Sequence, residues 1–361
     1  MVTPADAALM ARALFLAERG RGRTSPNPIV GAVVATPDGI VVGQGAHLGA
    51  GGPHAEVVAL DAAGGRARGA TLYCTLEPCC HTGRTGPCVE RIAAAGIARV
   101  VVATEDRNPQ VHGRGIAWLR SRGLEVAEGV RQAEARRQLA PFFCWISHRR
   151  PFVTLKVAVS RDGFVGRIGQ RVRLTSPAAD RYFHRERAAT DAIAVGSGTV
   201  LADDPQLTAR LVYRGRPLTS VLFDWSLRVT PSARVFSTAE AGPIIMVVSA
   251  RAHEARPDAV ARLTDTGAAI EPADTRDLGP ILAKLAAREI LSLLVEGGPR
   301  LHAAFLAAGL VDRIQRVVTS HVLGDGVPSA AGTDADPDAG GTRRVRLGAD
   351  EMRERDVHGT D

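Results

Sequence analysis

Hydrophobic positions in the first part of the chain switch between helical spacing and short apolar runs. Apolar residues three and four apart over 5–19 predict a helix. The apolar runs 29–35 and 40–44 flank Pro37-Asp38-Gly39, and this turn sequence predicts a β-hairpin. The same reasoning predicts helices at 55–63, 88–95, 115–122 and 130–144, and strands at 70–75, 100–103 and 124–127. Alternating helices and strands indicate an α/β layered domain.

A second α/β series follows the polar, basic segment 147–151, which we interpret as a linker. Gly, Ala, Asp and Pro dominate residues 324–341, and this composition predicts a mobile loop. The second series predicts strands at 152–160, 192–195, 220–223, 244–248, 291–295 and 314–319, and helices at 177–189, 278–287 and 299–308. The expected organisation is therefore two α/β domains, residues 1–146 and 151–361.

Composition agrees with this two-domain interpretation. The chain has 361 residues, of which 45% are hydrophobic and 23% charged, as in ordinary globular proteins. No apolar run approaches the roughly 18 residues of a membrane helix. The N-terminus has no basic stretch before an apolar block, so no secretory signal is expected. Four of the five cysteines cluster between residues 74 and 88, which favours thiol or metal chemistry in the cytoplasm over a disulfide framework.

The net charge of +7 does not by itself indicate a nucleic-acid partner. Arginines are interleaved with acids along the chain, and aromatic residues make up only 4% of it. A small phosphorylated substrate explains local arginines equally well. Of the 45 basic residues, only Lys156 and Lys284 are lysines, so we expect a retained lysine to be needed for its compact ammonium group.

The strongest chemical signal is His54-Ala55-Glu56, followed by Pro78-Cys79 and Pro87-Cys88. One imidazole and two thiolates can fill three positions of a tetrahedral Zn²⁺ and leave the fourth for water. A carboxylate two residues beyond the histidine suits proton transfer without metal contact. These residues predict a zinc hydrolase that deaminates an amino-heterocycle, with His54, Cys79 and Cys88 as ligands and Glu56 as proton shuttle.

The spacing of the cysteines leaves alternatives open. The generic deaminase signature has a tight C-x-x-C pair, whereas Cys79 and Cys88 are separated by a longer loop. Cys80 and His81 lie in that loop as rival ligands, and a fourth protein ligand would indicate a structural zinc in a non-enzymatic binding protein. For Cys74 we expect core packing.

The second half offers two glycine clusters. Gly196 and Gly198 follow a predicted strand, but Leu201 stands where a dinucleotide fingerprint needs its third glycine. Glu296-Gly297-Gly298-Pro299 places backbone N–H groups at a predicted helix start, which is a natural phosphate site. Each cluster alone is weak evidence.

Several segments together resemble the bacterial bifunctional riboflavin-biosynthesis deaminase/reductase family, in which the wider cysteine spacing is the rule. The resemblance covers nearly the whole chain to about residue 325 and fades beyond it. It implies a cytidine-deaminase-like three-layer domain at 1–146 and a dihydrofolate-reductase-like, NADPH-binding domain at 151–361. The segments that resemble the family are 25–31, 54–56, 77–88, 156–163, 192–205 and 294–310.

The resemblance implies hydrolytic deamination of 2,5-diamino-6-(5-phosphoribosylamino)pyrimidin-4-one to the uracil, followed by NADPH reduction of the ribosyl to a ribityl group. It also implies a homodimer formed through the reductase half. Hydride delivery to an opened sugar needs polar participants, and we expect Lys156 to donate a proton or orient the substrate and Asp203 to hold a hydroxyl group or the nicotinamide. The implied contacts are Asn27, His47 and Arg84 with the pyrimidine substrate; Ala158, Thr199, Asp203, Gly297 and Gly298 with NADPH; and Arg187, Leu207, Arg210 and Glu296 with the substrate of the reductase.

One segment departs from the family pattern. The family usually has Ser-x-Trp-Ile-Thr before the helix at 177, whereas this chain has Arg171-Val172-Arg173-Leu174-Thr175. Arg173 thus replaces a tryptophan that packs near the cofactor. One alternative is therefore an active deaminase with a weakened reductase. Another is a deaminase of a different nucleoside, nucleotide or nucleic-acid class, in which the second-half motifs would have no place.

Overall fold

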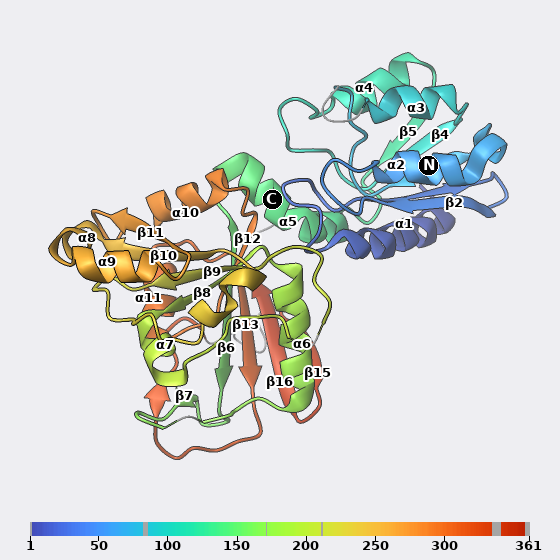
Figure 1. The fold of residues 1–361 in the computed structure, drawn as a ribbon. Coiled ribbons are helices and arrows are strands. Elements are labelled where there is room, and N and C mark those ends of the chain that lie inside the picture. The colour runs from blue at the N-terminus through green and yellow to red at the C-terminus, as the bar shows by residue number, and fades with distance from the viewer. Residues whose placement is uncertain (1, 82–85, 171, 211, 334–340, 358–361) are drawn as a thin grey trace. The chain divides into compact units, whose positions relative to one another are not determined.

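The structure is a computed structural model that describes residues 2–81, 86–170, 172–210, 212–333 and 341–357 (Figure 1). The chain divides into two compact units, and the boundary between them falls at Arg149 and Arg150. Each unit has its own central β-sheet. No helix in the described ranges combines the length and the apolar content that crossing a bilayer requires.

The first unit is built on a five-stranded sheet with the order β2-β1-β3-β4-β5. The predicted hairpin forms β1 and β2, which pair antiparallel, and β3, β4 and β5 run parallel to one another. The strands are β1 (Gly31–Ala35), β2 (Val41–Ala46), β3 (Thr71–Cys74), β4 (Arg99–Val102) and β5 (Glu125–Glu128).

Helices cover both faces of this sheet, which gives the predicted three layers. Apolar residues of α1 and α5 share one core cluster with inward-facing residues of β1, β3 and β4. Figure 1 shows α2, α3 and α4 on the opposite face. The helices are α1 (Pro4–Ala17), α2 (Ala55–Ala63), α3 (Cys88–Ala94), α4 (Arg114–Ser121) and α5 (Gln132–His148), with short 3₁₀ turns η1 (Glu18–Gly20) and η2 (Gly64–Ala67).

Small residues allow α2 to lie unusually close to β2. A Cβ atom at Gly43 would lie 2.1 Å from the carbonyl oxygen of Ala59, and one at Gly45 would lie 2.3 Å from that of Ala55. Both glycines face α2 because residues two apart on a strand share a face. This close approach fixes the start of α2 against the sheet.

The second unit is built on a nine-stranded sheet with the order β11-β10-β9-β8-β12-β6-β13-β16-β15. The strands from β11 to β13 are parallel, and β16 and β15 continue the sheet antiparallel. The strands are β6 (Phe152–Val159), β8 (Ala192–Gly196), β9 (Thr219–Phe223), β10 (Ile244–Ser249), β11 (Ala268–Ala273), β12 (Ser292–Val295), β13 (Arg313–Val318), β15 (Arg343–Leu347) and β16 (Asp350–Asp356). A separate pair joins β7 (Phe164–Gly166) to β14 (Val327–Pro328).

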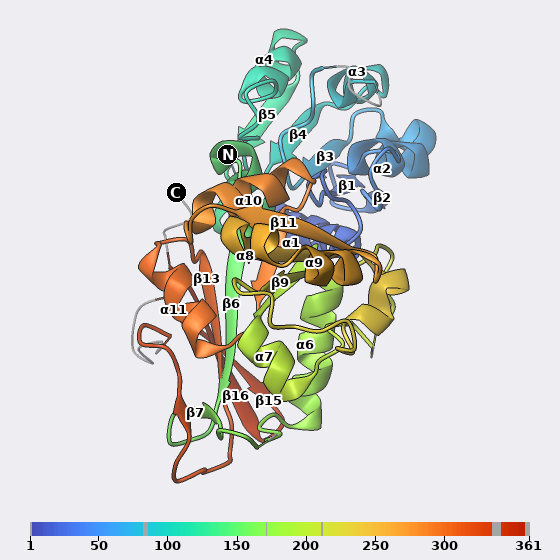
Figure 2. The ribbon, with the colours of Figure 1, turned by 60° about the vertical axis from the view of Figure 1, so that its left-hand side comes forward.

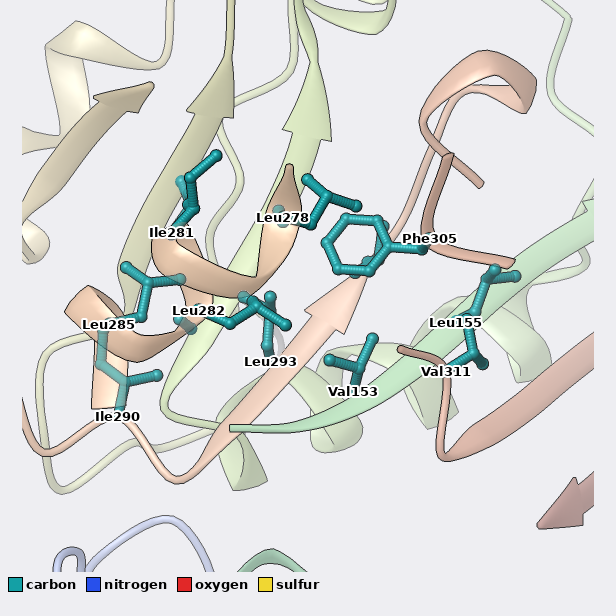
Figure 3. Close-up of a cluster of buried hydrophobic side chains, with 14 of the residues drawn as sticks. Val153, Leu155, Leu278, Ile281, Leu282, Leu285, Ile290, Leu293, Phe305 and Val311 are labelled. Carbon is teal, nitrogen blue, oxygen red and sulfur yellow. The ribbon is translucent and has the colours of Figure 1, made fainter. Parts of the chain in front are cut away.

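Two hydrophobic clusters sandwich this sheet. On one face, α10 and α11 bury Leu282 and Phe305 against Val153, Leu155 and their neighbours (Figure 3). Figure 2 shows α11 on one side of β6 and β13, with α6 and α7 on the other. The helices are α6 (Pro177–Ala189), α7 (Ser197–Asp203), α8 (Ala250–Ala255), α9 (Pro257–Thr264), α10 (Leu278–Ala287) and α11 (Pro299–Ala307), with the 3₁₀ turn η3 (Phe236–Ala241).

The predicted α/β class is confirmed, and each predicted helix and strand is present with small changes at its ends. Helix α5 extends to His148, so the segment interpreted as a linker begins within a helix. Strand β14 lies in the segment predicted as a loop. The sequence patterns missed β11, β15 and β16, together with the short elements α7, α8, α9 and β7.

Candidate functional site

Three elements of the first unit bring His54, Cys79 and Cys88 together. His54 is the N-cap of α2, Cys88 is the first residue of α3, and Cys79 follows β3. Their ligand atoms all lie within 4.8 Å of one another. The Nδ1 atom of His54 lies 3.1 Å from Cys88 Sγ and 3.5 Å from Cys79 Sγ. An imidazole and two sulfurs at this spacing match the donor set of a zinc site.

The surroundings favour a thiolate in this cluster. A hydrogen bond from the Cys88 thiol lowers the pKa of Cys79 to about 4, despite burial, and His54 contributes to the same effect. The backbone N–H of Cys88, at the start of α3, also donates to Cys79 Sγ at 3.3 Å. The pKa of Cys88 is raised in turn, first by its hydrogen bond to Cys79. Negative charge therefore collects where a divalent cation would bind.

Glu56 lies in the first turn of α2 beside this cluster, and its side chain is not one of the clustered ligands. The residue is only 4% exposed. Burial, reinforced by the negative charge of Cys79, raises the pKa of Glu56 to about 7. A carboxyl group with a pKa near neutrality can both accept and return a proton.

Asn27 and His47 form a hydrogen-bonded pair next to the cluster. His47 Nδ1 lies 3.0 Å from the carbonyl oxygen of Pro53, which can only accept, so Nδ1 carries the proton. His47 Nε2 then accepts from Asn27 Nδ2 at 3.1 Å. Burial lowers the pKa of His47, which keeps the ring neutral, and its edge packs on the His54 ring at 5.5 Å between centroids. This pairing orients the Asn27 amide so that its oxygen remains available to accept a hydrogen bond.

Glu77, to which sequence reasoning gave no role, holds the loop that approaches Cys79. Its carboxylate oxygens accept four backbone N–H groups, from Asp106, Gly113, Gly115 and Ile116, at 2.9–3.2 Å. The residue is 3% exposed. Its only sequence signal is an acid immediately before Pro78-Cys79, because its partners come from a distant segment.

Cys80 and His81, the two rival ligands, do not belong to the cluster of His54, Cys79 and Cys88. Cys80 Sγ points instead to the carbonyl oxygen of Gln110 at 3.8 Å, and neither Cys80 nor His81 belongs to the clustered set. Cys74 is fully buried in β3, which confirms the expected core packing. Arg84, predicted to contact the substrate, lies outside the described residues.

The second unit contains a cleft of about 1790 Å³ along the carboxyl ends of its parallel strands, where α/β sheets commonly bind ligands. All ten residues that the resemblance implies for the reductase line this one cleft. They are Lys156, Ala158, Arg187, Thr199, Asp203, Leu207, Arg210, Glu296, Gly297 and Gly298.

A buried ion pair organises the floor of the cleft. Arg187 Nε and Nη2 donate to the two carboxylate oxygens of Glu296, each at 2.6 Å. The Glu296 side chain is 8% exposed. Burial opposes ionisation of Glu296, but the Arg187 charge prevails and lowers its pKa to about 2. Arg214 donates to the carbonyl oxygens of Arg187, Ala188 and Thr190, so it caps α6 and fixes Arg187.

Lys156 lies on β6 beside this ion pair. Its ammonium group sits 4.6 Å from the ring centroid of Phe183, which is a cation–π contact. Burial lowers the pKa of Lys156, while the Glu296 carboxylate acts in the opposite direction. The residue thus keeps a proton that it can release more readily than a solvated lysine can.

The glycine pair Gly297-Gly298 lies between α7 and the start of α11. A side chain at Gly298 would approach Thr199 Oγ1 at 3.3 Å, and Gly297 has a φ of +138°. The Gly297 carbonyl oxygen accepts from the Gly196 N–H at 2.9 Å. Backbone N–H groups at this helix start form a site suited to a phosphate group.

Arg173 lies in the wall of the same cleft, and its guanidinium pairs with Asp180 at 2.6 Å. Arg171 lies outside the described residues. The cleft also contains residues that sequence reasoning did not select. They are His184, Trp225, Arg228, Arg276, Arg300 and His302.

Comparison with known proteins identifies relatives for both units. Residues 3–104 match the cytidine and deoxycytidylate deaminase zinc-binding region, and residues 151–350 match the RibD C-terminal domain. The riboflavin biosynthesis protein RibD of Aquifex aeolicus is 42% identical over 328 residues, covering 91% of this chain and 90% of that protein. Its Escherichia coli counterpart is 40% identical over 332 residues, with coverage of 88% and 89%.

Solved structures agree over almost the full length. A Thermotoga maritima protein described as a diaminohydroxyphosphoribosylaminopyrimidine deaminase/5-amino-6-(5-phosphoribosylamino)uracil reductase superposes with a TM-score of 0.84. It is 34% identical, and the match covers 98% of this chain and 99% of that one. Acinetobacter baumannii RibD superposes with a TM-score of 0.82 at 33% identity, covering 97% and 98%. The predicted pair of domain folds is therefore confirmed.

Proposed function

The chain belongs to the RibD family of riboflavin biosynthesis proteins, and from that premise we propose that it performs two consecutive reactions on one phosphorylated pyrimidine. The first unit hydrolyses the 2-amino group of 2,5-diamino-6-(5-phosphoribosylamino)pyrimidin-4-one to give the uracil and ammonia. The second unit reduces the ribosyl group of that uracil to ribityl with NADPH. Two observations support the proposal: His54, Cys79 and Cys88 cluster in the first unit, and the ten residues implied for the reductase line one cleft of the second unit.

The first site fits Zn²⁺ through its chemistry. His54, Cys79 and Cys88 offer three donors, and the described cluster contains no fourth protein ligand, so a coordination position stays open. Zinc bound there would supply a Lewis acid that lowers the pKa of water to about 7. We assign Glu56 the proton transfers, because its buried carboxyl has a pKa near 7. Glu56 takes a proton from the attacking water and passes it to the departing amino group, which leaves as ammonia.

We assign Asn27 and His47 to substrate positioning. The His47 ring fixes the Asn27 amide, whose oxygen can accept a hydrogen bond from a pyrimidine N–H. Arg84 keeps its predicted contact with the substrate as part of this proposal. The neutral His47 ring adds no positive charge next to the site for Zn²⁺.

The second site fits a dinucleotide and a phosphorylated sugar together. Bound NADPH would supply a hydride to C1′ of the opened ribosyl group. Lys156 donates the matching proton to the nitrogen or oxygen atom bonded to C1′, since its lowered pKa eases proton release. Glu296 holds Arg187 in place, and Arg187 and Arg210 face the substrate phosphate. Ala158, Thr199, Asp203 and the glycine pair contact the cofactor, and Leu207 contacts the substrate.

Substitution of Glu56 tests the deaminase assignment. Glu56→Gln keeps the size of the side chain but cannot accept a proton, so we expect one zinc per chain and no measurable ammonia release. The variant should still oxidise NADPH when supplied with the deaminated intermediate. Retained deamination would refute the role of Glu56, and loss of zinc would show that the substitution disrupts the metal site itself.

Arg173 raises the alternative of a weakened reductase, but full-length matches to deaminase/reductase proteins favour two active halves. The guanidinium is held against Asp180 at the cleft wall, so it can flank the nicotinamide in place of an aromatic ring. We expect Arg173→Trp to change the KM for NADPH by less than tenfold. A large gain in NADPH oxidation would support the weakened reductase instead.

We further propose a cytoplasmic homodimer that associates through the reductase half. All five cysteines are free thiols, as a reducing compartment favours. The dimer rests on family resemblance. Light scattering of the purified chain should give twice the monomer mass of 38.0 kDa, and a monomeric mass at micromolar concentration would contradict it.

A further inference from the structure

The end of the second cleft that is remote from Lys156 has its own chemistry. Lys156 lies on β6, whereas Trp225 and Arg228 follow β9, and Arg276 follows β11. The sheet order places β12 and β8 between β6 and β9. At about 4.8 Å per strand, β9 lies roughly 14 Å from β6.

This separation orders a bound dinucleotide along the cleft. The glycine pair follows β12, the strand that lies between β6 and β8, and its backbone N–H groups suit the diphosphate. Hydride transfer requires the nicotinamide near Lys156 and Ala158. The adenosine half must then extend toward the ends of β9, β10 and β11, where Trp225, Arg228 and Arg276 line the cleft.

Two arginines at this end are directed at the cleft rather than at acids. Arg276 stacks on the indole of Trp225, with 5.4 Å between its guanidinium carbon and the ring centroid. Arg228 Nη2 donates to Ser197 Oγ at 2.8 Å, which holds it across the cleft toward the start of α7. The ion pairs identified within the described ranges include neither Arg228 nor Arg276, whereas Arg173 and Arg187 each pair with a carboxylate.

Within the described residues, the acids that directly follow β9 and β11 do not line the cleft. Asp224, the residue after β9, is fully buried and accepts the backbone N–H of Val229 at 2.7 Å. Asp277 caps α10 by accepting the Gly279 N–H at 2.9 Å. A cofactor without a 2′-phosphate is usually recognised by an acid on the adenosine ribose, and one with it by a nearby arginine.

We propose that Arg228 and Arg276, together with the face of Trp225, form the subsite for the adenosine 2′-phosphate and so make this chain select NADPH over NADH. The adenine ring stacks on the indole, and the two guanidinium groups bind the 2′-phosphate through charge-assisted hydrogen bonds. This inference rests on the proposed reductase function and adds the residues that discriminate between the two cofactors.

Equilibrium binding to the full chain tests the subsite without measuring turnover. The dissociation constants for NADPH, NADH and adenosine 2′,5′-bisphosphate are measured by calorimetry for the wild type, Arg228→Gln and Arg276→Gln. Hydrogen bonds to charged groups contribute about 1.5–3 kcal/mol, so each variant should bind NADPH and the bisphosphate about 10- to 100-fold more weakly. Binding of NADH should change less than twofold.

Two further variants separate the contributions. Arg262→Gln removes an exposed arginine from α9, outside the cleft, and should leave all three constants unchanged. Trp225→Leu removes the stacking surface and should weaken NADPH and NADH by the same factor. An unchanged thermal unfolding transition of the second unit in every variant shows that this unit remains folded.

The outcomes distinguish this inference from the proposed function. Equal losses for NADPH and NADH in the arginine variants, or no loss for either, would overturn the 2′-phosphate subsite while leaving NADPH as the cofactor. Failure of the wild type to bind NADPH at all would overturn both. An NADPH-to-NADH preference that collapses in Arg228→Gln and Arg276→Gln, but not in Arg262→Gln, would establish the subsite.

Discussion

The contact between Gly45 and α2 offers the sharpest test of how the fold builds the metal centre. A Cβ atom at this position would lie 2.3 Å from the Ala55 carbonyl oxygen, whereas ordinary contacts begin at 3.4 Å. Because the atom that this Cβ would meet belongs to the backbone of α2, Gly45→Ala forces α2 to move away from β2 by about 1 Å. Ala55 stands between His54 and Glu56, so the retreat displaces a proposed ligand and the proposed proton shuttle together.

We expect Gly45→Ala to destabilise the first unit by about 1–3 kcal/mol, as overpacked cores generally do. A misplacement of about 1 Å in reacting groups lowers rates about 100-fold, so ammonia release should fall by that order. Reduction of the deaminated intermediate should not change, because residues of the second unit line that cleft. Thermal unfolding and separate assays of ammonia and NADPH measure the three effects.

Gly65→Ala is the matched control for this substitution. Gly65 lies in η2 directly after α2, and no atom lies within 4 Å of a Cβ built there. It should keep normal stability and deamination. Normal deamination in Gly45→Ala, or an equal loss in Gly65→Ala, would refute the argument that the close contact of α2 positions the site.

Three other predictions follow from buried charges and the metal. Asp6→Asn should cost about 3–5 kcal/mol at pH 7, because the buried Asp6 carboxylate pairs with Arg99 at 2.8 Å. Since Arg99 holds the pKa of Asp6 well below its usual range, this stabilisation is complete above the pKa of an unfolded aspartate, about 4, and is lost gradually as pH falls from there through the lowered pKa. Urea unfolding should therefore show a smaller difference at pH 3 than at pH 7, and a difference that does not shrink would contradict it. Glu296→Gln removes the charge that raises the pKa of Lys156, so the alkaline limb of NADPH oxidation should move to lower pH, and an unmoved limb would count against Lys156 as the proton donor. Dialysis against a chelator should abolish ammonia release, spare NADPH oxidation, and be reversed by Zn²⁺ alone; ammonia release from metal-free protein would exclude a metal-dependent reaction.

The elements that the sequence predicts well are those with apolar residues at regular spacing. Sequence patterns did not predict β11 and β15, the two edge strands, or β16, which lies next to β15, because these strands bury few apolar side chains. Strand β11 even contains Pro272, which edge strands tolerate. In β16, Met352 is buried in a strand that is otherwise mostly charged. Their pairing partners, rather than their own patterns, make them strands.

The residues of the candidate sites also differ in how well the sequence alone predicts them. His54, Glu56, Cys79 and Cys88 have a recognisable spacing, so sequence alone indicates both the residues and their chemistry. Glu77 could not be found this way, because its four N–H partners lie about thirty or more residues away.

Sequence patterns also did not predict the end of the second cleft where we propose that the adenosine half of the cofactor binds. Trp225 and Arg276 meet only because β9 and β11 flank β10 in the folded sheet. Nothing in the spacing of these two residues along the chain points to their contact.

Stoichiometry with the diaminopyrimidine substrate tests the whole account most directly. Without NADPH, the zinc-loaded chain should release one ammonia per substrate and accumulate the phosphoribosylamino uracil. Adding NADPH should then convert that uracil to the ribityl product, with one NADPH oxidised per ammonia released. Ammonia release without subsequent NADPH oxidation, or NADPH oxidation before deamination, would contradict two active sites working in this order.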